Sequence, residues 1–182
     1  ENLANYWIHN GFLTIKKEKM SKSLGNIVTI SEAVNKYSGQ VVRLALLSAH
    51  YSQPLDWNDD LLLNQKNVIN KWYNLYDEVD EKNSIEASKI LMDDLNTPGF
   101  IAKIHELYND GSNGHEDKKK QFNQACRLLG LFNISKKEWE NFKKRKISVS
   151  ESYILGKIEE RKKAKKNENF NLADKIRDEL YQ

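Results

Sequence analysis

The sequence has few of the residues that cross-link or interrupt a chain: one cysteine, two prolines and eight glycines among 182 residues. A single thiol, Cys126, excludes an internal disulfide framework and a cysteine-rich zinc site, and it fits a reducing compartment such as the cytoplasm. No apolar run approaches the roughly 18 residues of a membrane-spanning helix. With 30% of the residues charged, the sequence predicts a soluble protein with no membrane partner.

The first residues also lack the features of a natural start. Residues 1–4 contain no initiator Met, and no basic segment followed by an apolar one resembles a leader. We therefore expect the chain to be part of a longer polypeptide.

The small net charge of +3 is unevenly distributed. Residues 136–182 carry 14 basic and 9 acidic side chains, a net charge of +5, whereas the remaining residues carry a net charge of −2. The carboxy-terminal part is therefore a candidate for binding a polyanion. A solvated, charged helix explains the same composition equally well.

Scarce proline and glycine, with apolar residues three and four positions apart, predict a mainly helical chain. The exception is the start, where residues 6–9 and 12–15 are rich in aromatic and branched side chains around an Asn-Gly pair. They predict two short extended segments around a turn.

The helical stretches are predicted from caps and apolar stripes. The first helix follows the capping box at residues 29–32 and ends at Gly39, a buried helix covers 41–49, and a third is capped by Asn58 with an apolar face that reaches Val79. A helical stretch is expected around 85–92, and another helix restarts at Asn96-Thr97-Pro98 and runs through Tyr108. The last predicted elements are a helix around 122–129 and a helical hairpin with apolar stripes at 154–158 and 172–180. Residues 109–117, with two glycines and no aliphatic side chain, are expected to form an exposed loop.

Residues 19–26 read Lys-Met-Ser-Lys-Ser-Leu-Gly-Asn and carry the clearest chemical signal. Two lysines three positions apart supply mobile positive charges for phosphate oxygens. Small hydroxyl residues and glycine allow the backbone to approach a ligand closely. Such a loop can close over a triphosphate and neutralise charge that develops on departing pyrophosphate. Lysine content alone favours an ordinary basic surface turn.

The exact string resembles the KMSKS signature of class I aminoacyl-tRNA synthetases, and Trp7-x-His9-x-Gly11 precedes it at the spacing usual in that class. The resemblance implies a mobile loop that promotes adenylate formation. Lys22 is the residue we expect to contact ATP, although a structural histidine and a turn glycine would explain His9 and Gly11 nearly as well. The implied catalytic residues are Lys19 and Lys22, and the implied ATP-binding residues are Lys19, Met20, Ser21, Lys22, Ser23, His9 and Gly11.

Segments outside the loop indicate which synthetase the chain resembles. Residues 5–9, 48–52, 93–98 and 173–178 are all similar to the cysteinyl-tRNA synthetase family, so the resemblance runs nearly from end to end. It implies a mainly α chain in which residues 1–52 end a Rossmann-like α/β catalytic domain, residues 53–135 form a tRNA-contacting helical bundle, and residues 147–182 form a basic hairpin in the anticodon-recognition region. The residues that would touch tRNA are Lys143, Lys144, Arg145, Lys146, Lys162 and Lys163.

The family resemblance also implies cofactors and partners. They are ATP with Mg²⁺, cysteine and tRNA, for a protein expected to be monomeric. A soft thiolate bound to Zn²⁺ can distinguish cysteine from serine, which shape alone separates poorly. The zinc ligands and the first phosphate-binding signature of the family are missing from these residues, so we expect no metal ligands here and no adenylate formation by this fragment alone.

Three alternatives remain open at this stage. The chain could be a non-catalytic RNA-binding helical module, an ATP-dependent cysteine ligase that acts on a non-tRNA amine, or a structural bundle without a ligand. Among the other polar residues, Asp93, Asp94 and Asn96 suit helix capping better than metal binding. His50 and Tyr51 are expected to pack or bond locally and not to catalyse, and Cys126 is expected to lie in the core.

Overall fold

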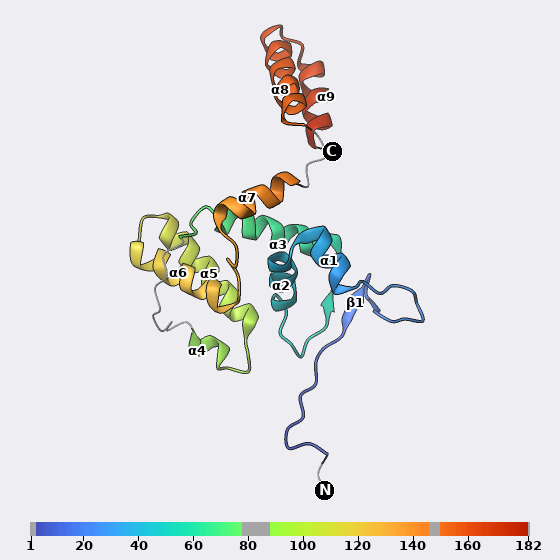
Figure 1. Cartoon of the computed structure of the whole chain (residues 1–182), viewed down its shortest axis with the longest axis vertical. Coiled ribbons are helices and arrows are strands. Elements are labelled where there is room, and N and C mark those ends of the chain that lie inside the picture. The colour runs from blue at the N-terminus through green and yellow to red at the C-terminus, as the bar shows by residue number, and fades with distance from the viewer. Residues whose placement is uncertain (1–2, 78–87, 146–149, 182) are drawn as a thin grey trace. The chain divides into compact units, whose positions relative to one another are not determined.

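The structure, a computed structural model, describes residues 3–77, 88–145 and 150–181 (Figure 1). Its elements are β1 (Leu13–Ile15), β2 (Glu18–Lys19), α1 (Ile30–Tyr37), α2 (Gly39–Leu47), β3 (Leu55–Asp56), α3 (Asp59–Trp72), α4 (Ser88–Leu91), α5 (Thr97–Ser112), α6 (Glu116–Leu128), α7 (Lys136–Arg145), α8 (Glu151–Lys166) and α9 (Phe170–Tyr181). Helices dominate the described residues, and a small mixed sheet lies near the start. The predicted mainly α fold class, with the end of an α/β domain, is confirmed.

The chain folds as two compact units, residues 1–136 and residues 137–182. The first unit holds the sheet and helices α1–α6, and the second holds α8, α9 and nearly all of α7. The finer division predicted from the sequence, with boundaries after residues 52 and 135, stays a prediction.

The sheet has β1 at its centre, between β2 and β3. Strand β1 pairs antiparallel with β2 and parallel with β3, with Thr14 opposite Lys19 and Asp56 respectively. The β1–β2 turn consists of Lys16 and Lys17, whose φ angles of 53° and 65° give the left-handed backbone that two-residue hairpins require.

Of the two extended segments predicted around Asn10-Gly11, the second contains strand β1, whereas residues 6–9 form no strand with the described residues. This segment is exposed and pairs with no strand of the described residues. Aromatic and branched residues favour extended backbone, but a strand also needs a partner ladder. The turn that does form was missed because it consists of lysines in place of the usual Asn-Gly.

Helix starts agree well with the predicted caps. Thr29 and Glu32 form the expected capping box at the start of α1, and the Asn58 side chain accepts the amide of Leu61 at the start of α3. Asn96 likewise accepts the amide of Gly99 at the start of α5. Side chains in the first turn suffice for these contacts, so the sequence alone locates them.

The observed helix ends agree less well with those predicted from the sequence. Gly39 begins α2 and does not end α1, because Ser38 makes the break with a φ of 97°. Helix α3 ends at Trp72, where the amides of Asn74 and Leu75 turn back to carbonyls three residues earlier. The predicted face at Val79 and the start of the stretch at Ile85 lie outside the described residues.

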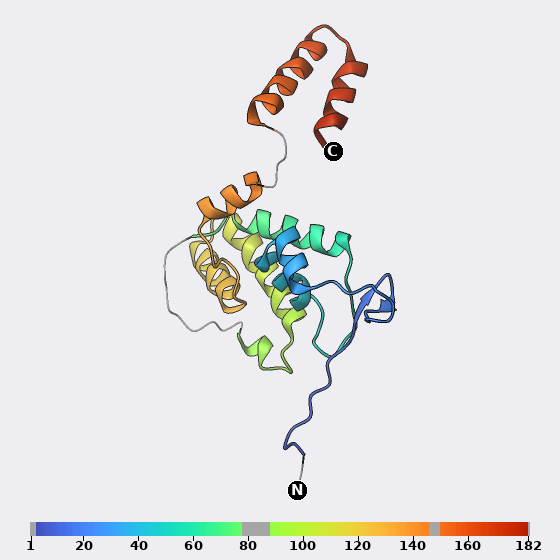
Figure 2. The same cartoon turned by 45° about the vertical axis from the view of Figure 1, so that its right-hand side comes forward.

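The predicted loop at residues 109–117 is mostly helix. Helix α5 continues to Ser112 and α6 begins at Glu116. Gly111 is a packing glycine, because a Cβ there would lie 2.9 Å from Leu75 Cδ2 and 3.0 Å from Lys119 Cα. The glycine permits close contact between α5 and α6, which run side by side in both ribbon views (Figures 1 and 2).

An aromatic cluster and one polar hub fill the core of the first unit. Tyr73 and Phe132 have ring centroids 4.9 Å apart, and Trp72 contacts Phe122 edge to face. Gln40 is buried, and its Oε1 accepts the Phe132 amide at 2.7 Å while its Nε2 lies 3.0 Å from the Tyr73 hydroxyl. Satisfied buried amides of this kind fix one arrangement of the packed elements.

The second unit contains the predicted helical hairpin, which is confirmed. Helices α8 and α9 run antiparallel around a small core of Ala164, Ala173 and Ile176 (Figure 2). The Tyr153 hydroxyl on α8 donates to Glu179 on α9 at 2.5 Å, and this carboxylate also pairs with Lys157.

Candidate functional site

The base of the 19–26 loop is closed by backbone and amide hydrogen bonds. The Met20 amide donates to the Leu13 carbonyl at 3.0 Å, which extends the β1–β2 ladder into the loop. The Asn26 side chain then spans the base, because its Oδ1 accepts the Ser21 amide at 2.9 Å and its Nδ2 lies 3.4 Å from the Lys19 carbonyl. The final Asn of the motif therefore closes the loop, a role that the sequence did not reveal.

The tip of the loop is a turn that displays its lysine. The Gly25 amide donates to the Lys22 carbonyl at 3.1 Å, and Gly25 has a φ of 64°. The Lys22 side chain is exposed, and no described residue forms a hydrogen bond or ion pair with it. An ammonium group on such a turn is available to an anionic ligand.

The first lysine is placed differently. The Lys19 ammonium lies 4.0 Å from the centroid of the Phe12 ring, a cation–π contact that draws it toward the segment before β1. Ser21 and Ser23 have hydroxyl oxygens 3.2 Å apart, and Met20 is half-buried. Residues 19–23 therefore belong to one loop in which both lysines are exposed, and we call this loop the lysine surface.

Gly11 lies beside this surface for a packing reason. Its amide donates to the Tyr51 carbonyl at 2.8 Å, and a Cβ at Gly11 would lie 2.1 Å from the Gln53 carbonyl oxygen. His9 is exposed on the segment before it, and the described residues give His9 no hydrogen bond to the loop. The structure thus connects Gly11 to the loop through Phe12 and leaves His9 apart.

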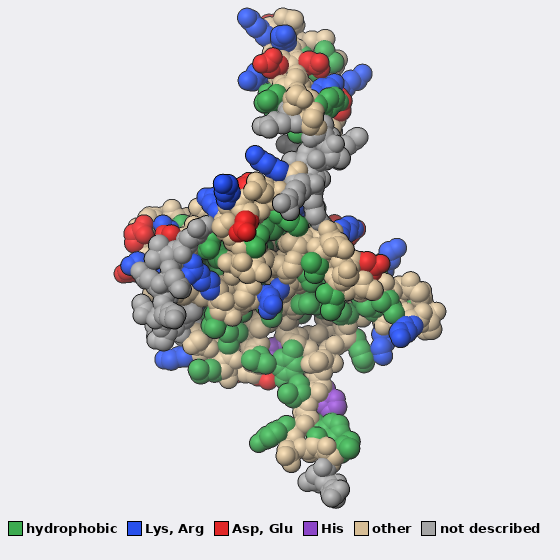
Figure 3. Space-filling model, in the orientation of Figure 1, with side chains coloured by type: hydrophobic (Ala, Val, Ile, Leu, Met, Phe, Trp, Pro, Cys, Tyr) green, Lys and Arg blue, Asp and Glu red, His purple; other side chains and the backbone are tan. Residues whose placement is uncertain are grey.

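The segment that carries His9 also exposes large apolar side chains. Leu3, Tyr6 and Ile8 are at least three-quarters exposed, and Trp7 is two-thirds exposed. Figure 3 shows hydrophobic side chains gathered on this extension. Clustered exposed apolar residues are typical of surfaces that contact another molecule.

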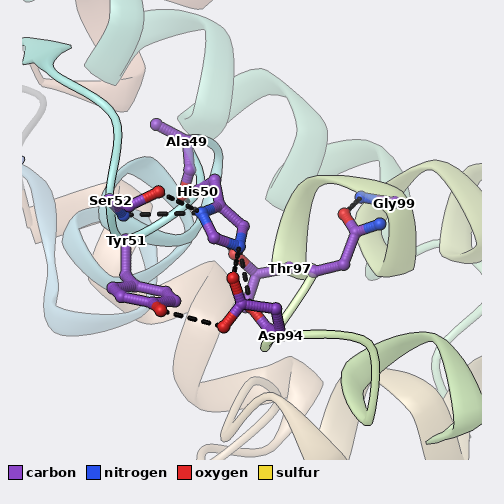
Figure 4. Close-up of polar contacts among 8 residues, drawn as sticks. Ala49, His50, Tyr51, Ser52, Asp94, Thr97 and Gly99 are labelled. Atoms are coloured by element: carbon purple, nitrogen blue, oxygen red, sulfur yellow. Dashed lines mark hydrogen bonds and ion pairs between the residues drawn. The ribbon is translucent and has the colours of Figure 1, made fainter. Parts of the chain in front are cut away.

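His50 bonds locally to Ser52, as expected, and both His50 and Tyr51 also bond to a distant residue, Asp94 (Figure 4). His50 Nε2 lies 2.7 Å from the Asp94 carbonyl, and the Tyr51 hydroxyl donates to Asp94 Oδ1 at 2.8 Å. The hydrogen bond to Asp94 raises the pKa of Tyr51 above its ordinary value. The helix-capping role predicted from the sequence is therefore correct for Asn96 but not for Asp94. The Asp94 carboxylate instead accepts a hydrogen bond from Tyr51, in the loop between α2 and β3.

The basic residues of the second unit that are predicted to contact phosphate differ in their exposure and in whether they already form an ion pair. Lys143 is partly exposed and pairs with Glu140 at 2.6 Å, whereas Lys144 is exposed. The Arg145 side chain and Lys146 lie outside the described residues. Lys162 and Lys163 are exposed near the end of α8, beside Lys165 and Lys166.

An exposed aromatic residue accompanies these lysines and was missed by sequence reasoning. Phe170, the first residue of α9, is 61% exposed and follows the lysine-rich end of α8 after three residues. Figure 3 shows basic side chains distributed over this hairpin. Lysines around an exposed aromatic ring are typical of surfaces that bind unpaired nucleotides. The sequence did contain a signal for this residue, because Phe170 is an aromatic residue between the two apolar stripes of the predicted hairpin.

A cleft of about 460 Å³ lies next to the loop and was not predicted. Its lining includes Ile27 and Val28, which follow the loop, and Trp57 before α3. Lys36 and Tyr37 both hydrogen-bond Asp59 at its rim, which lowers the pKa of Asp59. None of residues 19–23 lines this cleft, so it is separate from the lysine surface.

The thiol and the acidic side chains form no metal site within the described residues. Cys126 is fully buried, as predicted, and burial raises the pKa of its thiol well above the ordinary value. Among the residues that the structure describes, no three His, Cys, Asp or Glu side chains group as metal ligands, and no helix is long and apolar enough to cross a membrane.

Comparison with known proteins first defines the class. Residues 1–67, which contain the sheet strands β1, β2 and β3 and the lysine loop, match the family described as tRNA synthetases class I (C) catalytic domain. The chain therefore includes part of a class I synthetase catalytic domain.

Similarity over the whole chain then defines the family. The chain is 48% identical over 179 residues to the cysteine–tRNA ligase of Pelagibacter ubique, which covers 97% of this chain and 40% of that protein. It is 39% identical to the enzyme of Xanthobacter autotrophicus (98% of this chain, 40% of that protein) and 40% identical to that of Rickettsia bellii (97% and 40%). The chain belongs to the cysteine–tRNA ligase family, and it spans about 40% of the length of these curated relatives.

Proposed function

We propose that this chain supplies the ATP-closing loop and the tRNA-binding helices of an enzyme that joins cysteine to its tRNA through a cysteinyl-adenylate. The observation that carries the proposal is the lysine loop, closed at its base by Asn26, with Lys22 displayed and unpaired among the described residues. It occurs in a chain similar over nearly its whole length to cysteine–tRNA ligases.

Lys22 and Lys19 have separate roles in this proposal. Lys22, on the exposed turn, contacts the triphosphate and stabilises negative charge as pyrophosphate departs. Lys19, drawn toward Phe12, orients the nucleotide at the side where Gly11 lies. Met20, Ser21 and Ser23 shape the loop around ATP, and His9 borders the nucleotide when the rest of the catalytic domain is present.

The basic hairpin is proposed to bind tRNA. Lys162 and Lys163 are exposed, so they can neutralise phosphates, and Phe170 offers a ring on which an unpaired base can stack. Lys143, Lys144, Arg145 and Lys146 are proposed to contact tRNA phosphates as well. The proposed parts are residues 1–52 for the catalytic domain, 53–135 for the bundle and 147–182 for the anticodon region.

We propose that the residues of this chain do not ligate the metal ions of the enzyme. The described side chains do not offer a zinc site, so we propose that Zn²⁺, which would distinguish the cysteine thiolate from serine, is held elsewhere in the complete enzyme. Mg²⁺ would arrive with ATP. The buried, unreactive thiol of Cys126 fits an enzyme of the reducing cytoplasm.

The test is amino-acid-dependent ATP–pyrophosphate exchange by the full-length protein, with cysteine, serine and methionine compared. We expect exchange with cysteine alone. Lys22→Ala should lower kcat/KM about 10²- to 10³-fold, the usual loss when one group that stabilises transition-state charge is removed. Lys89→Ala, which removes an exposed lysine of α4, is the matched control and should leave the rate unchanged.

Three outcomes would contradict the proposal in different ways. Absence of exchange with every amino acid from folded protein would favour a non-catalytic RNA-binding module. Cysteine activation without transfer to tRNA would favour a cysteine ligase that acts on another amine. Undiminished exchange in Lys22→Ala would remove the proposed role of the loop.

A further inference from the structure

The loop between α2 and β3, residues 48–54, determines where the segment before β1 lies. The Tyr51 carbonyl accepts the Gly11 amide at 2.8 Å, and the Gln53 carbonyl packs directly against Gly11. Immediately after the loop, the Leu55 amide donates to the Phe12 carbonyl at 3.0 Å. A shift of this loop would therefore move Gly11 and Phe12 with it.

The same loop is also held by Asp94, in the turn between α4 and α5 (Figure 4). Asp94 accepts the Tyr51 hydroxyl on Oδ1 at 2.8 Å and the His50 ring on its backbone carbonyl at 2.7 Å. Because a carbonyl can only accept, His50 carries its proton on Nε2, and its Nδ1 is left to accept from the Ser52 hydroxyl at 2.7 Å. We call His50, Tyr51 and Asp94 the loop latch.

The conformation of Asp94 explains how one residue makes both contacts. Its φ is 48° and that of Leu95 is 53°, so two successive residues adopt the left-handed conformation. This backbone is costly for residues other than glycine and persists where the surroundings fix it. The turn is also fixed by Asn96, which caps α5, and by the Thr97 hydroxyl, which lies 3.5 Å from the Ala49 carbonyl in the same 48–54 loop.

We propose that Asp94 is a positioning residue for nucleotide binding. It holds the 48–54 loop, the loop holds Gly11 and Phe12, and Phe12 meets the Lys19 ammonium. The helices that follow the catalytic domain thereby set the edge of the ATP site through one turn. This inference rests on the proposed function, because it takes Gly11 and Lys19 to border ATP.

The side-chain part of the latch is separable from the backbone part by substitution. Asp94→Gly keeps a residue that adopts positive φ readily but removes the acceptor of the Tyr51 hydroxyl. Asp94→Asn tolerates the same backbone and keeps an acceptor oxygen. Tyr51→Phe removes only the donor. Asp93→Gly changes the neighbouring acidic residue, whose side chain has no partner among the described residues, and is the matched control.

The experiment is ATP–pyrophosphate exchange by the full-length protein and these four variants, with KM for ATP and kcat determined separately. Asp94→Gly and Tyr51→Phe should each raise KM for ATP about fivefold, as expected for one hydrogen bond, with kcat within about twofold of the unmodified protein. Their combination should raise it little further, since both remove the Tyr51–Asp94 hydrogen bond and Asp94→Gly removes in addition only the carboxylate oxygen that lies 3.7 Å from His50 Nε2. Asp94→Asn and Asp93→Gly should match the unmodified protein.

A merely structural role predicts a different pattern. It would lower the melting temperature and the active fraction, and so the apparent kcat, without changing KM for ATP. That pattern, or an equal rise of KM in Asp93→Gly, would overturn the proposal. If Asp94→Gly fails to fold, Tyr51→Phe decides the question alone.

Hydrogen exchange at the Gly11 amide separates failure of the latch from failure of the proposed function. Asp94→Gly should increase the exchange rate of this amide severalfold, whether or not the protein activates cysteine. Faster exchange without any cysteine-dependent activity in the unmodified protein would support the latch and contradict the proposed function. An unchanged exchange rate would contradict the latch.

Discussion

Two glycines near the loop are required for different physical reasons. Gly11 is enclosed, since a Cβ would lie 2.1 Å from the Gln53 carbonyl oxygen, and its backbone has no need of positive φ. Gly25 is open, since a Cβ there would meet nothing within 4 Å, but its φ of 64° disfavours other residues. Space limits the first position and backbone conformation limits the second.

These two reasons predict opposite responses to asparagine. Gly25→Ala should destabilise the chain by about 1–2 kcal/mol, and Gly25→Asn should recover most of that loss because asparagine tolerates the left-handed conformation. Gly11→Ala and Gly11→Asn should both cost about 1–3 kcal/mol, because either side chain forces the segment away from residue 53. Urea unfolding of the four variants measures the difference. Recovery by asparagine at position 11 would contradict the packing account.

Among the elements, α1 depends on local side-chain contacts more than its neighbours do. Only Ala33 is buried within this helix, so its first turn relies on the capping box of Thr29 and Glu32. Hydrogen bonds from the Thr29 backbone, and then from its side chain, lower the pKa of Glu32 below its ordinary value of 4.5. The ionised carboxylate therefore stabilises the folded chain.

The sign of this shift predicts a pH dependence for the cap. A carboxyl whose pKa is depressed on folding stabilises the protein above its unfolded pKa, and this stabilisation is lost as the pH falls through the folded pKa. Glu32→Gln should therefore be less stable than the unmodified chain at neutral pH, and the difference should vanish in acid, below the lowered pKa. Urea unfolding of both proteins as a function of pH measures it. A difference that persists in acid would show that the charge is not involved.

The hairpin α8–α9 contains lysines that are paired and lysines that are free to meet a polyanion. Lys157 pairs with Glu160 and Glu179, whereas Lys162 and Lys163 are exposed with no ion pair among the described residues. The hydrogen bond from Tyr153, and then that from Lys157, lowers the pKa of Glu179, so the paired end of the hairpin is held by an ionised carboxylate. The two ends of the hairpin thus have different roles.

Each free lysine that contacts phosphate should contribute to the salt dependence of tRNA binding. Lys162→Ala and Lys163→Ala should each reduce the slope of log K against log salt by about one, whereas Lys157→Ala should leave it unchanged. Phe170→Ala should weaken binding by about 1–3 kcal/mol with little effect on the slope, because stacking involves no counterion release. Fluorescence anisotropy with tRNA over a salt series measures all four. Equal slopes for every lysine variant would contradict a tRNA-binding hairpin.

For the whole molecule, the decisive fact is that the chain corresponds to about 40% of its relatives' length. It has the loop that we propose closes on a nucleotide, but the described residues contain no metal-ligand group. The apolar side chains exposed from Leu3 to Ile8 add a surface without a described partner in the chain.

Residues 1–182 alone should accordingly form no cysteinyl-adenylate and bind no zinc tightly, although they fold. ATP–pyrophosphate exchange and competition with a chromophoric zinc chelator measure the two properties. The positive control is the full-length protein under the same conditions. Measurable adenylate from the isolated residues would show that the loop and its neighbours suffice for catalysis.

The sequence alone determined the features that depend on near neighbours in the chain. Residues 19–26 indicated the loop and its chemistry, and Thr29, Asn58 and Asn96 indicated helix starts, because a cap forms within one turn. The apolar stripes likewise predicted the α8–α9 hairpin and the buried position of Cys126. The lysine loop therefore required no tertiary information to be found.

Tertiary structure decided what depends on contacts between distant residues. It placed Gly111 between two packed helices where a loop was expected, and it left residues 6–9 without a strand partner. It also joined Tyr51 to Asp94 across 43 residues, although each had been assigned a local role. The physical reason is that a side chain's preference fixes its own backbone, whereas packing space and hydrogen-bond partners come from elements that only folding brings together.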